Sequence, residues 1–382
     1  MPRPTFARKP RLRAGLTLLR RGEETHLQSA RVESVSSLDD PDGVWHALLE
    51  CCDGRRDARA IHTELSGAGY PVGEGDVRAG LSALADAGFL VEGAHDRDDE
   101  WANQRAYLEQ FATADASAED MLETVRATTV LILGAGGVGS WLAHGLTLMG
   151  VRELVVVDPD RVEAANLTRQ LYPLEAVGSR KIEALGVALR RLRPDLGFRG
   201  IDLMATDPDD LGALLEGVDV VAGCADHPTA DDAAELVARA CVPARMPHTV
   251  AAYAGPVARV GPTWLPNRRL ACQCCLQLVR ERDDASWSAT PEEARRLKPR
   301  RAAVTVAQAQ LVAALAATEI LHLRAGLDPA TAGHVVALDL RTLRSFRSRV
   351  PRQRDCPLCG SKTSARKGRR HDPASAREEV NV

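Results

Sequence analysis

The chain has 382 residues, of which 45% are hydrophobic, and its formal net charge at pH 7 is −3. This length can bury one large core or two unequal ones, and the slight negative charge argues against nucleic-acid binding. No stretch approaches the roughly 18 uncharged apolar residues of a membrane span, and residues 1–13 lack a signal peptide's apolar segment. We therefore expect a cytoplasmic protein with no membrane partner. Nine cysteines, four of them in two C-x-x-C pairs, favour metal binding over disulfides.

Residues 1–93 are predicted to form a small separate domain. A polar R-R-G-E-E segment between two short apolar stretches predicts a β-hairpin. Apolar residues at helical spacing then predict three helices, and a short strand at 89–91 follows Gly88. These elements lie near residues 16–28, 44–52, 58–65 and 77–85. Strands followed by three helices and a last strand indicate a winged-helix-like α+β domain.

This order of elements is similar to the PqqD-like leader-peptide recognition domain of enzymes that modify ribosomally made peptides. The resemblance implies that an extended leader adds a strand to the sheet edge and packs on the third helix. A DNA-binding winged helix is one alternative. However, the third helix carries Glu74, Asp76 and Asp86 against Arg78, so it offers phosphate little positive charge. A structural cap on the rest of the chain is another alternative.

Residues 94–100 are charged and are interpreted as a linker, and residues 101–360 as a second domain. Its most informative stretch begins with an apolar run at 130–133, a glycine turn, a helix over 140–149 and a second apolar run at 154–157. Gly134 permits a tight exit from the first strand, Gly136 lets backbone approach a phosphate, and Gly139 lets the helix lie close to the sheet. Asp158 follows the second strand, where a carboxylate accepts ribose hydroxyls. This layout predicts a nucleotide-binding βαβ unit.

Further charged residues indicate which nucleotide is bound. Arg169 follows the unit, Lys181 begins a helix that runs to Leu192, and Asp226 follows another apolar strand. Two cations and a second carboxylate at strand ends suit a triphosphate with Mg²⁺, whose ligands would include Asp226. There is no G-K-[S/T], so the glycine turn is not a Walker-type loop. The continuing alternation of helices and strands predicts a doubly wound, mostly parallel α/β sheet.

These residues resemble the ThiF/MoeB/HesA adenylating enzymes, relatives of the ubiquitin-activating enzymes. The GAGGVGS turn, the D-P-D, the N-L-T-R-Q segment, the lysine and the strand-ending aspartate carry the resemblance, which covers about residues 101–360. It implies that ATP activates the C-terminal carboxylate of a peptide or small carrier protein as an acyl-adenylate. It also implies that Arg169, Lys181 and Asp226 are catalytic. The nucleotide-binding residues it implies are Gly134, Gly136, Gly137, Gly139, Asp158, Asn166, Arg169, Gln170, Lys181 and Asp226.

One position departs from the family pattern. In the helix predicted at 101–111, the family places an arginine that reaches the phosphates, often those of a neighbouring subunit. Here that position is Asn103. By analogy with phosphoryl-transfer enzymes, loss of such an arginine costs roughly 10³–10⁵ in rate. Arg105 is an alternative, but two residues along a helix turn it away from that direction, so we expect it to be a solvated surface arginine.

Cysteines provide a second signal. The C-x-x-C pairs Cys272/Cys275 and Cys356/Cys359 predict a closed structural Zn²⁺ site, and the family's knuckles fit the same choice, with Cys274 left out. Cys51, Cys52, Cys224 and Cys241 are interpreted as small buried hydrophobes or inert thiols rather than nucleophiles. His248, in an apolar strand, is interpreted as a core residue.

The end of the chain contains a long alanine-rich helix near 302–323, which is predicted to pack in the core or to form a homodimer. Residues 361–382 are polar and predicted to be disordered. Two functions remain. The first is adenylation of a precursor peptide or carrier protein in the biosynthesis of a ribosomally made modified peptide. The second is a catalytically silent partner that delivers a precursor peptide to a YcaO-type cyclodehydratase. The charged residues favour the first, and Asn103 favours the second.

Overall fold

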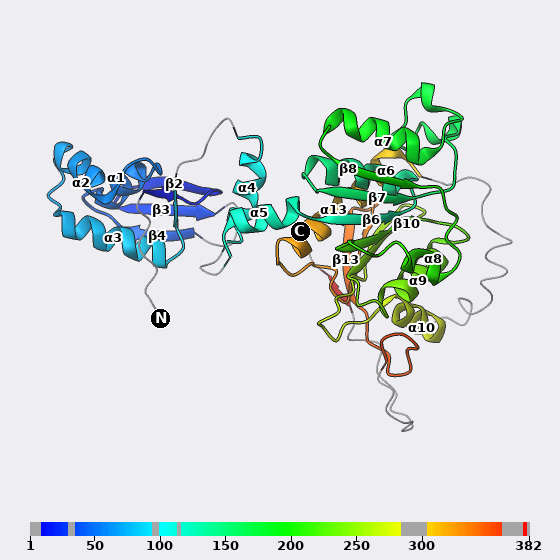
Figure 1. Cartoon of the computed structure of the whole chain (residues 1–382). Helices are drawn as coiled ribbons and strands as arrows, with labels where there is room; N and C mark the ends of the chain where they lie inside the picture. The colour runs from blue at the N-terminus through cyan, green and yellow to red at the C-terminus, as the bar shows by residue number, and fades with distance from the viewer. Residues whose placement is uncertain are drawn as a thin grey trace. The chain divides into compact units, whose positions relative to one another are not determined.

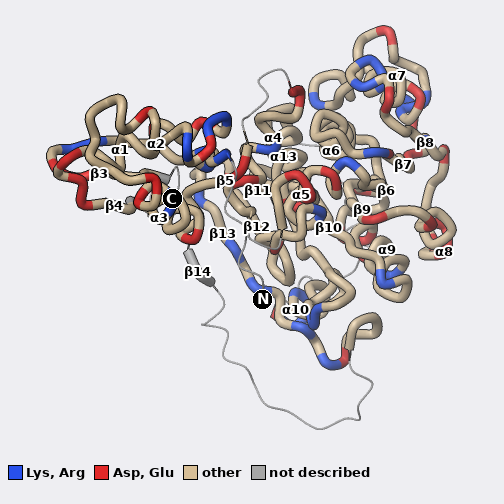
Figure 2. Tube along the Cα trace, turned by 60° about the vertical axis from the view of Figure 1, so that its left-hand side comes forward, with Lys and Arg blue, Asp and Glu red and all other residues tan. Residues whose placement is uncertain are grey.

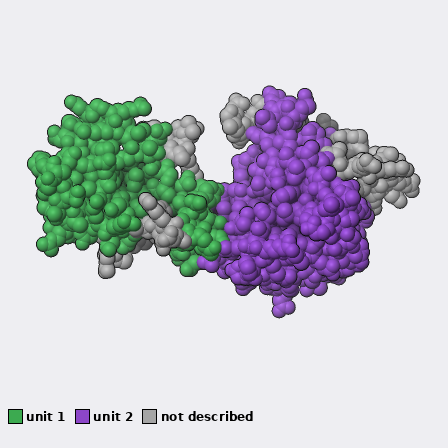
Figure 3. Space-filling view, turned by 90° about the horizontal axis from the view of Figure 1, so that it is seen from above, with its two compact units in different colours: residues 1–123 green, residues 124–382 purple. Residues whose placement is uncertain are grey.

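A computed structural model gives the structure of the chain and describes residues 9–29, 35–93, 99–112, 116–283, 304–360 and 377–379. The chain forms two compact units that divide between Glu123 and Thr124 (Figure 3). Each unit has its own hydrophobic core, so each is described separately.

Unit 1 contains two small antiparallel sheets and the three predicted helices (Figure 1). The predicted hairpin is confirmed as β2 and β3, which pair with β4, whereas the last strand, β5, pairs with β1 instead of with the hairpin. Leu27, Ile61 and Leu81 are fully buried between the hairpin and the helices. The elements are β1 Pro10–Leu12, β2 Leu16–Arg21, β3 Glu24–Ser29, β4 Val35–Asp39, α1 Val44–Cys51, α2 Ala58–Gly67, α3 Glu74–Asp86 and β5 Leu90–Glu92.

Helix α3 has the charge pattern expected from the sequence. Glu74 and Asp76 lie in its first turn, and the Arg78 guanidinium pairs with the Glu74 carboxylate at 2.8 Å. The helix therefore offers no basic face to a nucleic acid backbone. In unit 2, three basic residues lie along β13 Arg344–Arg349: Arg344, Arg347 and Arg349 (Figure 2).

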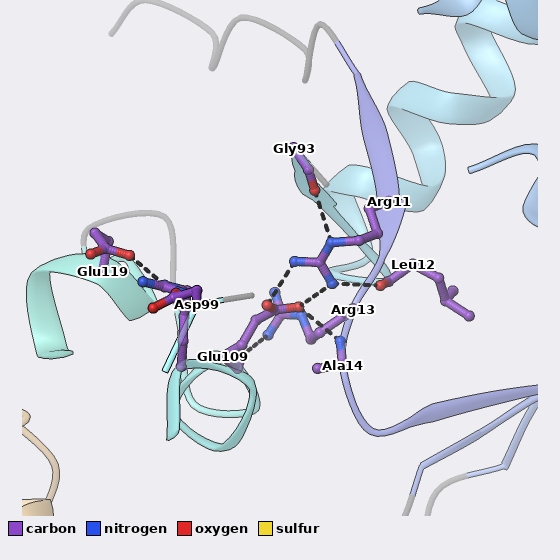
Figure 4. Close-up of polar contacts among 9 residues, drawn as sticks. Arg11, Leu12, Arg13, Ala14, Gly93, Asp99, Glu109 and Glu119 are labelled. Atoms are coloured by element: carbon purple, nitrogen blue, oxygen red, sulfur yellow. Dashed lines mark hydrogen bonds and ion pairs between the residues drawn. The ribbon is translucent and has the colours of Figure 1, made fainter. Parts of the chain in front are cut away.

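A buried carboxylate fixes helix α4, Ala102–Glu109, to unit 1. Glu109 is 4% exposed, and its carboxylate accepts hydrogen bonds from the Arg11 guanidinium at 2.8 Å and the Ala14 backbone N–H at 2.7 Å (Figure 4). Arg11 also donates to the Gly93 carbonyl at 2.8 Å. Unit 1 therefore extends past residue 93, the boundary predicted from the sequence, and contains α4. The division of tasks between a domain 1–93 and a domain 101–360 stays a prediction.

Unit 2 is built on a doubly wound sheet, as predicted. Five parallel strands stand in the order β8-β7-β6-β9-β10, and antiparallel strands β11, β12, β13 and β14 extend the sheet beyond β10. Their bounds are β6 Thr129–Leu133, β7 Glu153–Val157, β8 Gly197–Ile201, β9 Val220–Gly223, β10 His248–Ala254, β11 Val257–Val260, β12 His334–Asp339 and β14 Arg377–Glu379. The strand β14 lies within the tail predicted to be disordered, and the rest of that tail lies outside the described residues.

Helices cover both faces of this sheet because its strands are apolar on both sides. On β6, Val130 and Ile132 face one core with α6, α7 and α13, whereas Leu131 and Leu133 face the other with α8 and α9. The bounds are α6 Gly137–Leu148, α7 Lys181–Leu192, α8 Pro208–Gly212, α9 Ala230–Cys241, α10 Gln273–Asp283 and α13 Val306–Arg324, with short 3₁₀ turns η1 Ala164–Asn166 and η2 Leu174–Ala176. Helix α5, Ala118–Arg126, spans the division between the two units.

Among the described helices, α13 alone is long and apolar enough to be compared with a membrane span. Half of its apolar window is buried, and Val312, Ala316 and Ile320 belong to the same core as α6. The helix is therefore a core element of unit 2, in agreement with the packed helix predicted from the sequence.

Candidate active site

The glycine turn joins β6 to α6 with very little space. Gly134 has a φ of +94°, and a Cβ at this position would lie 2.8 Å from the Ala225 backbone. A Cβ on Gly139 would lie 1.8 Å from the Gly134 carbonyl oxygen, so only glycine lets the helix start this close to the strand. Helix α6 begins at Gly137, three residues before the predicted Ser140. Its first turn therefore points free backbone N–H groups into the site.

A cavity of about 350 Å³ lies at the carboxyl ends of the parallel strands. Nine of the ten residues predicted to bind nucleotide line it, and Gly139 alone lies outside the lining, under the turn. The nine are Gly134, Gly136, Gly137, Asp158, Asn166, Arg169, Gln170, Lys181 and Asp226. Residues spread over more than 90 positions of the sequence thus meet around one space.

Asp158 and Lys181 form the side of the cavity next to β7. The Asp158 carboxylate is 5% exposed and accepts hydrogen bonds from the backbone N–H groups of Ala135 at 2.6 Å and Asp160 at 2.9 Å. The Lys181 ammonium lies 3.7 Å from Asp158 and 2.7 Å from the Asp160 carboxylate. Burial raises the pKa of Asp158, and Lys181 and the two amides oppose that rise. The Asp160 side chain was missed by the sequence reading, although it is the second acid of the D-P-D.

The η1 turn brings Asn166, Arg169 and Gln170 to the cavity. The Asn166 side chain accepts a hydrogen bond from the Glu163 backbone N–H at 2.9 Å, which fixes the turn. Arg169 donates to the Ala165 carbonyl at 2.7 Å. Its Nε and the Gln170 Oε1 are buried without a partner among the described residues. Buried polar atoms normally have partners, so a donor and an acceptor left over beside a cavity fit a polar ligand such as a nucleotide.

Asp226 follows β9 and lines the cavity opposite Asp158. Carboxylate oxygens of this kind suit Mg²⁺, so the donor set fits the predicted ion. Tyr253, at the carboxyl end of β10, also lines the cavity and was missed by the sequence reading. Burial raises the pKa of Tyr253, the negative charge of Asp226 raises it further, and the positive charge of Arg169 lowers it. The rule that ligands bind at the carboxyl ends of parallel strands was the signal that could have found it.

Arg105 is a surface residue, as predicted, but it is ion-paired and only partly exposed. Its guanidinium forms ion pairs with Asp99 and Glu119, and its side chain is 24% exposed (Figure 4 labels both acids). Both partners belong to unit 1, like Arg105 itself. Asn103 leaves α4 without the family's arginine at the expected position.

The four predicted zinc ligands come together. The Sγ atoms of Cys272, Cys275, Cys356 and Cys359 lie within 4.8 Å of one another, and all four side chains are buried. Cys272 and Cys356 are 3.5 Å apart, and Cys275 and Cys359 are 3.3 Å apart. Four thiolates around one point are compatible with a closed tetrahedral Zn²⁺ site. Cys274 is buried beside them but is not part of the cluster.

Cys241 and His248 have the properties of core residues, whereas Cys224 is partly buried and lines the cavity. Burial raises the pKa of Cys224 and of Cys241 to about 12, so neither is a thiolate at neutral pH. His248 is 1% exposed and stacks on Trp264. Burial lowers the pKa of His248 to about 4, so it is neutral, and its interpretation as a core residue is confirmed.

Comparisons with known proteins agree with this site. Residues 107–359, about two-thirds of the chain, match the ThiF family. Protein HesA of Leptolyngbya boryana is 28% identical over 64% of this chain and 81% of its own. Ubiquitin-like modifier-activating enzyme 5 of Gallus gallus is 37% identical over 28% of this chain and 29% of its own.

The fold of the whole chain also has solved counterparts. A crystal structure of E. coli MccB with MccA-N7isoASN superposes with a TM-score of 0.73 at 20% identity, over 92% of this chain and 99% of MccB. The family match does not reach residues 1–93, so the PqqD-like interpretation of the small domain stays a prediction. The chain belongs to the ThiF family and is a ThiF/MoeB-like adenylyltransferase.

Proposed function

We propose that this protein uses ATP to adenylate the C-terminal carboxylate of a precursor peptide or small carrier protein, in the biosynthesis of a ribosomally made modified peptide. The meeting of nine predicted residues around one cavity supports it most strongly. A carboxylate oxygen attacks the α-phosphorus of ATP, the bond to the β-phosphate oxygen breaks, and pyrophosphate leaves with that electron pair. No proton is transferred, so the protein's task is positioning and charge stabilisation.

The roles follow from the contacts. Asp158 accepts the ribose hydroxyls, since its oxygens are already oriented by two backbone N–H groups. The first turn of α6 donates N–H groups to a phosphate, and Arg169 and Lys181 stabilise the charge that develops on the leaving pyrophosphate. Asp226 would hold Mg²⁺, which when bound neutralises phosphate charge.

The peptide substrate is supported by the solved structures with this fold. MccB is described as a microcin C7 biosynthetic enzyme, and structures of it hold MccA or ATP. In unit 1, β2 and β4 are the edges of the three-stranded sheet, and either edge can accept the backbone of an extended leader. A cytoplasmic location and a homodimer are parts of the same proposal.

The second candidate is the silent partner that delivers a precursor peptide to a cyclodehydratase. One observation favours it: the expected phosphate-binding arginine is replaced by Asn103, and Arg105 is occupied by Asp99 and Glu119. A silent partner would keep the fold and the zinc cluster while losing turnover.

Pyrophosphate release from ATP and Mg²⁺, measured with precursor peptides encoded beside this gene, tests the proposal. We expect release with a genuine partner peptide, and a loss of at least about 100-fold in Asp226→Asn. Asp195→Asn is the matched control, because its carboxylate is 80% exposed and lies outside the cavity. ATP binding without turnover across the partner peptides would instead support the silent partner.

Hydrogen exchange tests the small domain separately. On titration of the full chain with a leader peptide, backbone amides of β2 or β4 should become protected along one edge. Protection confined to unit 2, or no binding, would exclude leader recognition by unit 1. Neither result would bear on the proposed adenylation.

A further inference from the structure

Tyr253 occupies a distinct place in the order of residues around the cavity. The strands stand in the order β7, β6, β9, β10, so the site runs from Asp158 across the glycine turn to Asp226 and then Tyr253. Asp158 marks the ribose end of this series. Tyr253 therefore lies at the far end, beyond the phosphate-binding turn. An acyl-adenylate carries its acyl group on the side of the phosphate away from the ribose.

The hydroxyl of Tyr253 is held against the phosphate-binding groups. It lies 3.5 Å from the point that a Cβ on Gly137 would occupy, at the first residue of α6. Tyr253 lines the same cavity as Arg169 and Asp226. The ring packs against the core that contains α6 and α13, which fixes its orientation. The hydroxyl thus lies beside the phosphate-binding turn.

The phenol supplies a neutral donor. Its O–H can donate to a ligand oxygen in the cavity that Tyr253 lines. Burial and Asp226 raise the pKa of Tyr253, so the phenol keeps its proton at neutral pH. A neutral donor at this point complements an anionic or carbonyl oxygen without the desolvation cost of another charge.

We infer that the Tyr253 hydroxyl donates a hydrogen bond to the acyl-phosphate group of the acyl-adenylate. The inference rests on the proposed function and deepens it, because it assigns a residue to the acyl end of the ligand. Tyr253 is then a specificity residue, whose hydroxyl contributes to the affinity for the acyl-adenylate but not to the affinity for AMP or ATP.

Binding to the full-length protein tests this without knowledge of the peptide. The probes are AMP, ATP with Mg²⁺, and 5′-O-[N-(N-acetylglycyl)sulfamoyl]adenosine, a stable mimic of a peptidyl-adenylate. In Tyr253→Phe we expect the affinity for the mimic to fall about 10- to 100-fold, while the affinities for AMP and ATP stay close to those of the parent protein. Phenylalanine keeps the packing of the ring, and an unchanged thermal midpoint confirms that the fold is intact.

Tyr172→Phe is the matched variant. It also removes a buried phenol hydroxyl, but that hydroxyl donates to the Ala135 carbonyl in the glycine turn at 2.7 Å. It should therefore leave the ratio of mimic to AMP affinity unchanged. Equal losses for ATP and the mimic in Tyr253→Phe, no loss for either, or a parent protein that holds the mimic no tighter than AMP would each overturn the inference. A parent protein that binds no ATP would overturn the proposed function itself.

Discussion

At the scale of single residues, the site depends on how one buried carboxylate is kept charged. Asp158 lies where burial favours its neutral form, and its pKa is raised above the ordinary 3.8. The Lys181 ammonium at 3.7 Å and two backbone N–H groups act against burial. Only the ionised carboxylate accepts two ribose hydroxyls, so nucleoside affinity and the charge of Lys181 are linked.

This linkage predicts a pH dependence. The affinity for adenosine should be complete at neutral pH and should fall as pH drops through the raised pKa of Asp158. Lys181→Met removes a group that lowers this pKa, so the fall should begin at a higher pH than in the parent protein. Adenosine is the probe because it has no phosphate to titrate in this range. In Asp158→Asn the affinity should be low and flat over the same range. If the loss of adenosine affinity at low pH began at the same pH or at a lower pH in Lys181→Met than in the parent protein, the linkage would be contradicted.

The roles of several residues could be predicted from sequence because they follow strand ends. Asp158 comes directly after β7 and Asp226 comes three residues after β9, so their meeting at one sheet edge follows from parallel topology. Tyr253 lies within β10, next to its last residue, but tyrosine is common in strands and has no charge that would mark it as a candidate. The pairing of Arg105 with Asp99 and Glu119 could not be predicted, because it depends on how α4 packs within unit 1.

At the scale of elements, the cysteine cluster links two segments that are far apart in the sequence. It joins the start of α10 to the segment after β13, 84 residues further on. Four buried thiols within 4.8 Å contribute little to stability by themselves, whereas a bound Zn²⁺ contributes through ligand bonds that an unfolded chain cannot form.

Cys275→Ser should therefore lower the zinc content below one ion per chain and lower the thermal midpoint by about 6–12 °C, as a loss of about 3 kcal/mol would. The neighbouring Cys274→Ser is the matched control, since Cys274 is equally buried but outside the cluster. Metal analysis and thermal unfolding of both variants check this. A zinc-free Cys274→Ser, or a zinc-replete Cys275→Ser, would show that the ligand set is different.

A second contact that joins elements is the ion pair between Glu109 and Arg11. Glu109→Gln keeps the volume but sets an amide N–H₂ against the Arg11 guanidinium, which is 13% exposed and loses its counter-charge. We expect unit 1 to lose about 3 kcal/mol of its free energy of unfolding. Hydrogen exchange of β1, β5 and α4 in the full chain measures it. Glu74→Gln, at an exposed pair on α3, should give no measurable change. Equal effects of the two variants would contradict the role of burial.

At the scale of the whole molecule, the sequence predicts the two folds better than the point where one unit ends. Periodicity and turn residues identify the hairpin, the three helices and the βαβ unit, because these depend on local spacing. The boundary depends on a contact between residues about 95 positions apart, Ala14 and Glu109. The polar segment 94–100 contains no sequence signal for that contact. The sequence therefore places the boundary at this charged stretch instead.

This difference predicts how the chain can be divided. A fragment that begins at residue 94 keeps α4 but removes Arg11 and Ala14, so the buried Glu109 carboxylate loses its partners. A fragment that begins at residue 116 removes α4 together with the rest of that contact. We expect the second fragment to be monodisperse, to bind one zinc ion and to keep the parent protein's affinity for adenosine. The first should aggregate, or should show α4 exchanging its amides as an unfolded segment does. Size-exclusion chromatography and hydrogen exchange decide between them, and a well-behaved fragment 94–382 with a protected α4 would place that helix with the adenylating unit after all.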